Sequence, residues 1–164
     1  MGMVAYLRQA STEEVAAIRK HPSTIDDFLF PEIEDGRLVD FDKAWHALHF
    51  MLTGEIGSTD HPLNLLVAGD AELFGTDENG FGGFWLAEPD RVSVFASTLS
   101  QISDEEIAAR YNPERMSAEQ IYLSDVFEDE GAEALPYVLQ GLPSLRRLVI
   151  QASQSGAYIV GALR

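Results

Sequence analysis

Hydrophobic residues recur at helical spacing along most of this chain, and short apolar runs stand near both of its ends. The runs 3–8 and 157–163 predict buried strands, because each is largely apolar and is bounded by capping or turn residues. The most regular helical stripe lies in residues 41–53, with Gly54 as the residue that ends the helix. Other helices are predicted over residues 12–20, 24–29, 62–68, 89–102, 103–111, 130–140 and 143–154, and a short strand over 84–87.

Two capping boxes fix helix starts within this pattern. Ser11 precedes Glu14 by three residues, and Ser103 precedes Glu106 in the same way. Within each pair, the side chain of one residue can accept a hydrogen bond from the free backbone N–H of the other. Because the strands stand near the chain ends, the simplest pairing sets them side by side. The sequence therefore predicts an α+β fold, a single helix-rich domain over residues 1–164 with a small mixed sheet that pairs the N- and C-terminal strands.

Composition restricts the classes of partner. The chain has 164 residues, of which 27 are acidic and 11 basic, for a formal net charge of −16. This charge repels phosphate backbones and anionic membranes, so we expect neither nucleic acid nor membrane as a partner. Seven acids face one base between residues 26 and 42, ten face two bases between 104 and 133, and no acid follows Glu133. The acid excess belongs to the middle of the chain and favours a basic protein as partner.

The sequence contains no complete catalytic or metal-binding motif. His46 and His49 lie one helical turn apart and Asp60 or His61 is the nearest third ligand, but the HExxH spacing is absent. We expect His49 to be a hydrogen-bonded residue at the core edge and His46 to lie at the surface, with no metal and no cofactor. The glycine-rich stretch 75–83 lacks a phosphate-binding motif and is expected to be a mobile turn.

Two further absences bear on location. The chain has no cysteine, which excludes disulfides and favours a reducing cytoplasm. No stretch offers the ~20 apolar residues that a membrane-spanning helix needs. We therefore expect a cytoplasmic protein, and the oligomeric state stays open.

Residues 40–54, DFDKAWHALHFMLTG, resemble a segment of the YfbM-like family of small bacterial proteins, a domain of unknown function. The matching residues are Asp40, Asp42, Lys43, Trp45, Leu48, His49, Phe50, Leu52, Thr53 and Gly54. The resemblance continues through the opening MGM, Pro62, Leu63, Gly69, Val92, Ala96, Leu99, Ile121 and Tyr122. Leu123 stands where the family often has proline, and Glu88 where it commonly has threonine. The resemblance implies an α+β domain and no particular activity.

Two functional hypotheses follow. The first is a non-catalytic module that binds a basic protein through its acidic surface, for which an inhibitor or toxin-neutralising role is one concrete version. The alternative is a small-molecule-binding protein or enzyme with a pocket beside the Trp45/His49 helix, where His49 acts as general acid or base. Its polar and aromatic set is Asp40, Asp42, Lys43, Trp45, His49 and Thr53. The structural interpretation of the same residues is capping by the aspartates, core packing by Trp45 and a locking hydrogen bond from His49.

Overall fold

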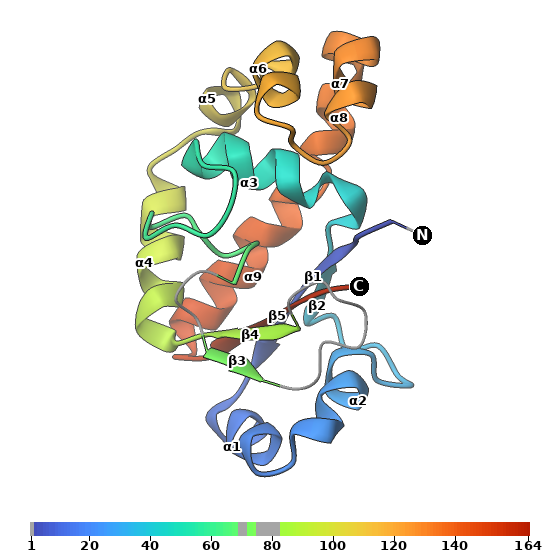
Figure 1. Cartoon of the computed structure of the whole chain (residues 1–164). Coiled ribbons are helices and arrows are strands. Elements are labelled where there is room, and N and C mark those ends of the chain that lie inside the picture. The colour runs from blue at the N-terminus through green and yellow to red at the C-terminus, as the bar shows by residue number, and fades with distance from the viewer. Residues whose placement is uncertain (1, 69–71, 75–82) are drawn as a thin grey trace.

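A five-stranded antiparallel sheet carries helices on both faces in the computed structural model, which describes residues 2–68, 72–74 and 83–164 (Figure 1). The strands are β1 (Ala5–Ala10), β2 (Leu38–Asp40), β3 (Glu72–Phe74), β4 (Phe84–Ala87) and β5 (Tyr158–Leu163), in the order β2-β1-β5-β4-β3. The predicted pairing of the terminal strands is confirmed, because β1 and β5 lie side by side from Ala5↔Leu163 to Ala10↔Tyr158. The predicted turn at 75–83 lies, apart from residue 83, outside the described residues.

The sheet is antiparallel at every described pairing, so the expectation of a mixed sheet is wrong. The physical reason is the path between β4 and β5. Helix α4 (Pro89–Ser100) leaves the end of β4, and α9 (Leu142–Gln154) packs against α4 and returns to the same end of the sheet. Ala87 at the end of β4 therefore lies opposite Ile159 near the start of β5, and the two strands run in opposite directions.

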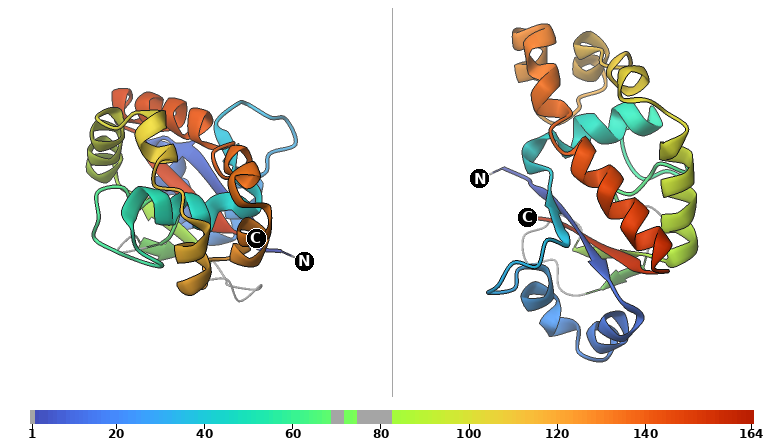
Figure 2. Two further views of the ribbon diagram at one scale, coloured as in Figure 1. Left: turned by 90° about the horizontal axis from the view of Figure 1, so that it is seen from above. Right: turned by 180° about the vertical axis from the view of Figure 1, so that it is seen from behind.

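Each face of the sheet has its own helices and its own apolar cluster (Figure 2). Helices α1 (Thr12–Lys20) and α2 (Ile25–Leu29), joined by η1 (Pro22–Thr24), cover the face to which Val160 contributes. Helices α3 (Trp45–Thr53), α4 and α9 cover the face to which Ile159 contributes. Successive residues of β5 thus serve opposite faces, as a strand that is buried on both sides requires.

The region farthest from the sheet consists of short helices. They are α5 (Asp104–Ala108), α6 (Pro113–Ala118), α7 (Ser124–Glu130), the 3₁₀ turn η3 (Gly131–Ala134) and α8 (Leu135–Val138). The predicted helix over 130–140 is thus wrong as one element. The segment begins at Gly131, whose φ of +57° separates it from α7, and it consists of the 3₁₀ turn η3 followed by α8. Within the described residues no helix has the length and apolar character needed to cross a membrane.

The predicted helix over residues 62–68 is wrong, because these residues form a turn followed by an irregular segment. The Leu63 N–H donates to His61 Nδ1 at 3.0 Å, and the Trp85 indole donates to the Leu65 carbonyl at 3.0 Å. Leu63, Leu65 and Leu66 are all buried, and a short irregular segment places all three against the core.

Candidate functional site

The segment that carries the family resemblance begins, at the end of β2, with two aspartates that cap no helix. The Asp40 carboxylate accepts a hydrogen bond of 2.7 Å from the Asp42 N–H, and Asp42 has φ +48°. The Asp42 carboxylate accepts a hydrogen bond of 2.9 Å from the Tyr137 hydroxyl on α8. Burial and this carboxylate raise the pKa of Tyr137 to about 12. The expected capping is wrong, and the helix opens instead with an uncapped 3₁₀ turn, η2 (Asp42–Ala44).

Lys43 and Trp45 pack against the start of the chain. The Trp45 indole N–H donates to the Met3 carbonyl at 3.1 Å, and the Met3 N–H donates to the Tyr122 hydroxyl at 3.2 Å. A Cβ on Gly2 would lie 2.5 Å from Lys43 Cε and 2.6 Å from Tyr122 Oη, so a larger residue there would displace both side chains. The opening residues, the segment 40–54 and Tyr122 all match the family. They therefore meet at one place although they lie far apart in the sequence.

His46 is a partly buried residue with a defined tautomer, so the expectation that it lies at the surface is wrong. Its Nδ1 accepts a hydrogen bond of 2.9 Å from the Tyr122 N–H. Its Nε2 therefore carries the proton and donates to the Ile56 carbonyl at 2.7 Å. The ring stacks on Trp45 with 4.9 Å between centroids, and burial lowers the pKa of His46.

His49 is fully buried and holds the loop that follows α3. Its Nε2 lies 2.9 Å from the Gly57 carbonyl, to which it donates, and its Nδ1 has no hydrogen-bond partner among the described residues. Burial lowers the pKa of His49 to about 4. The Thr53 hydroxyl donates to the His49 carbonyl at 2.9 Å and accepts from the Glu55 N–H at 3.1 Å. Both side chains therefore serve the turn after the helix.

The six predicted site residues consequently divide into two groups at opposite ends of one helix. Asp40, Asp42, Lys43 and Trp45 lie near the start of the chain, whereas His49 and Thr53 lie at the loop. Within the described residues, no three His, Asp or Glu side chains are grouped as metal ligands.

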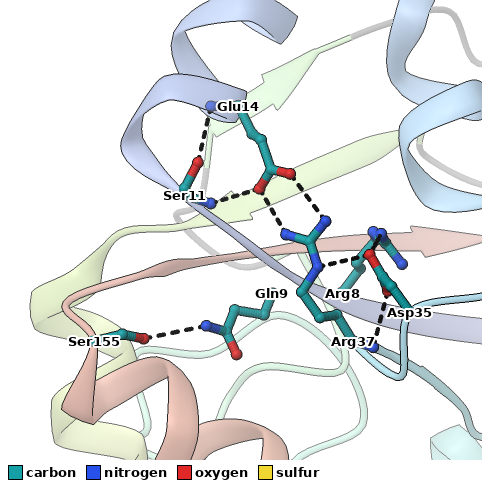
Figure 3. A network of polar contacts seen from close by, with 7 residues as sticks. All are labelled: Arg8, Gln9, Ser11, Glu14, Asp35, Arg37 and Ser155. Atoms are coloured by element: carbon teal, nitrogen blue, oxygen red, sulfur yellow. Dashed lines mark hydrogen bonds and ion pairs between the residues drawn. The ribbon is translucent and has the colours of Figure 1, made fainter.

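An ion-pair network that the sequence analysis did not identify fixes the acidic loop 31–36 (Figure 3). Arg37 pairs with Glu14 through two contacts of 2.8 and 2.9 Å, and its Nε lies 2.8 Å from Asp35. Arg8, buried in the sheet, contacts the same Asp35 at 2.5 Å. Partial burial raises the pKa of Asp35, but the two guanidinium groups outweigh it and lower the pKa to about 2. Ser11 shares Glu14 through the capping box that the sequence predicted.

The acids between residues 104 and 133 are exposed, except for the partly buried Glu119. The two bases of this segment point toward α3. Arg110 donates to a backbone carbonyl of α3 at 3.2 Å, and the Arg115 guanidinium lies 4.9 Å from the centre of an aromatic ring of α3. Among the described residues, Asp104 alone of these acids has an ion pair, with Arg146 of α9 at 2.8 Å. We refer to α5, α6 and α7 as the acidic helical end.

Two hollows flank the edge strand β2, one on each face of the sheet. The first has a volume of about 220 Å³ and is lined by Tyr6, Arg8, Glu34, Asp35, Leu38 and Asp40. The second has a volume of about 200 Å³ and is lined by Val39, Ser144, Arg147, Leu148 and Gln151, together with Gly36 and Leu38, which line both hollows. They are termed the acidic hollow and the α9 hollow below. The sequence did not predict either hollow. The signal that could have indicated this region is Arg37, the one base among seven acids between residues 26 and 42.

The fold and these contacts define a helix-rich α+β protein whose first residues are anchored on α3. The model of the family described as "Domain of unknown function (DUF1877)" matches residues 1–161, and the chain belongs to this family. Protein YfbM of Escherichia coli (strain K12) is 24% identical over 171 residues, which cover 98% of this chain and 100% of that protein. The crystal structure of a protein of unknown function, YfbM from Escherichia coli, matches with a TM-score of 0.75 at 19% identity, over 98% of this chain and 99% of that one. The expected resemblance and the α+β fold class are confirmed.

Proposed function

We propose that this chain is a non-catalytic, cytoplasmic module that binds a basic protein through its acidic surface, and that inhibition of a basic enzyme or toxin is one form of that activity. The observation that carries the proposal is the acidic helical end. Its carboxylates face solvent, while Arg110 and Arg115, the bases within the segment, are directed toward α3. The cysteine-free sequence supports the cytoplasmic location.

Exposed like charges that nearby bases neutralise only in part sum to a field that extends about one Debye length into the solvent. Such a field accelerates encounter with a basic surface and repels acidic ones, so it gives selectivity by charge. The binding that it supports weakens as salt concentration rises. A basic partner is therefore the class of protein that this surface favours.

The test is affinity purification with two matched variants. One variant neutralises α7 by Asp125→Asn, Glu128→Gln, Asp129→Asn and Glu130→Gln. The control removes the same number of charges elsewhere by Glu13→Gln, Glu55→Gln, Asp60→Asn and Asp90→Asn, all at exposed positions. We expect the wild type and the control to recover the same basic protein at low salt, and the α7 variant to recover much less.

Salt supplies the second readout. At about 1 M salt, where the Debye length is about 3 Å, recovery by the wild type should fall sharply. Recovery of no specific partner by the wild type at low salt, or equal recovery by both variants and in high salt, contradicts the proposal.

The alternative is a small-molecule-binding protein or enzyme with a pocket beside the Trp45/His49 helix. Of its six predicted residues, Asp40 lines the acidic hollow, which lies beside β2 on the sheet face opposite to that helix. Asp40, which leads into that helix, lines this hollow together with Tyr6 and Arg8. A thermal-shift screen with metal ions and nucleotides tests it, because a ligand that binds only the folded state raises the melting temperature. A shift in the wild type that Asp40→Asn abolishes would favour this alternative over a protein partner.

A further inference from the structure

The outer edge of β2 has backbone groups available for another strand. The Arg37 carbonyl accepts a hydrogen bond of 3.2 Å from a β1 N–H, and the Phe41 N–H donates to a β1 carbonyl at 3.0 Å. These bonds recur at every second residue of an antiparallel ladder, so the backbone N–H and C=O groups of Val39 also face β1. The N–H and C=O groups of Leu38 and Asp40 therefore point away from β1. Among the described strands none pairs with this edge, which lies at the margin of the sheet (Figure 2).

The two hollows lie where the side chains of an added strand would point. Successive side chains of a strand project to opposite faces of the sheet. The acidic hollow lies on the face of Leu38 and Asp40, and the α9 hollow on the face of Val39 and Leu148. An extended peptide beside β2 would thus place one side chain in the acidic hollow and the next in the α9 hollow. Recognition by strand addition combines such backbone bonds with pockets for alternate side chains.

The charge of the acidic hollow selects the side chain that enters it. Asp35 is already paired with the buried Arg8, so these two charges compensate each other. Glu34 and Asp40 are exposed, and within the described residues neither takes part in an ion pair. Tyr6 also lines the hollow, and its aromatic ring can add to the attraction for a cation. The hollow therefore suits the ammonium of Lys or the guanidinium of Arg.

We propose that β2 is a docking edge, on which an extended segment of a basic protein adds as a further strand and places a Lys or Arg side chain in the acidic hollow. This inference rests on the proposed function. It names the surface of this chain that binds the partner and the extended conformation of the partner's backbone. The acidic helical end then supplies long-range attraction, and β2 supplies the specific contact.

The experiment uses the full chain, isotopically labelled, and a library of short synthetic peptides with Lys or Arg at alternate positions. We expect the tightest-binding peptide to slow hydrogen exchange at the Leu38 and Asp40 amides, because both N–H groups become bonded, and to leave the amides of α7 unchanged. A version of that peptide with N-methyl groups on its β2-facing amides keeps its charge but lacks the donors. We expect it to lose binding.

Paired variants separate the hollow from general charge. Glu34→Gln with Asp40→Asn should weaken binding about tenfold, the scale of a lost charge-assisted hydrogen bond. The asparagine retains an oxygen to accept the Asp42 N–H, so the turn is preserved. Glu55→Gln with Asp60→Asn removes the same charge from the loop after α3 and should leave affinity about unchanged.

Three results overturn the docking edge: no peptide of the library binds, the N-methylated peptide binds as well as its parent, or the protection appears on the acidic helical end instead of β2. If the α7 variant loses the protein partner while the β2 variant keeps it, the proposed function stands and the docking edge is wrong. If neither variant affects the protein partner, the proposed function is wrong as well.

Discussion

Acid should destabilise this protein through His49. The imidazole is fully buried, and burial, with a smaller effect from His46 and His61, lowers its pKa to about 4. The same side chain in an unfolded chain has a pKa of about 6.5. Between these two values the unfolded chain binds a proton that the folded chain does not, so the free energy of unfolding falls as pH drops from about 6.5 to about 4. At about pH 5 the difference spans about 1.5 pH units, which corresponds to a loss of about 2 kcal/mol.

Urea denaturation followed by circular dichroism at about pH 8 and about pH 5 measures this loss. His49→Gln removes the titration while its amide N–H can still reach the Gly57 carbonyl. His21→Gln is the matched control, because His21 is exposed. His46, whose pKa is also lowered, is present in all three proteins, so its contribution cancels in the comparison. We expect the wild type and the control to lose about 2 kcal/mol more than His49→Gln, and an equal loss in all three would refute the reasoning.

Three substitutions test other contacts by the free energy of unfolding in urea. Gly161→Ala should destabilise by about 3 kcal/mol, because its Cβ would lie 2.1 Å from Cε2 of the buried Trp85; a change near zero would contradict this packing. Gln120→Gly should stabilise by about 1 kcal/mol, because Gln120 has φ +55°, and Gln120→Ala should give no such gain. Glu88→Ser should stabilise by about 1 kcal/mol, because Glu88 makes no capping hydrogen bond and serine can make one. Loss of the exposed Arg19 contact reduces this gain slightly, and no gain at all would show that α4 needs no cap.

Features of this fold that depend on neighbours in sequence were predictable. The capping boxes at Ser11 and Ser103 form as expected, because each joins groups three residues apart. The terminal strands were also predictable, since each apolar run is too short for a typical helix and is bounded by capping or turn residues. Strand β2 was missed because three residues between an acidic loop and a helix have too little pattern to distinguish a strand from a loop.

The residues of the candidate site depend on partners that are distant in sequence. Asp42 was expected to cap a helix, but it accepts the hydroxyl of Tyr137, 95 residues further along the chain. His46 was expected at the surface because helical angles alone do not show that Tyr122 supplies a backbone N–H to it. The family departure at Leu123 is explained by its φ of +64°, which the ring of proline cannot adopt, so this turn differs from one that contains proline.

The position of β5 in the centre of the sheet has a consequence for synthesis. The pairs β2–β1 and β4–β3 are each complete before β5 leaves the ribosome, yet only β5 joins them. A two-stranded ribbon is marginally stable by itself, so the nascent chain exposes unpaired edges and apolar faces until that strand emerges. Ala5 must then pair with Leu163 across nearly the whole sequence, a long-range closure that slows folding. The strand order therefore leaves the sheet incomplete until β5 has been synthesised.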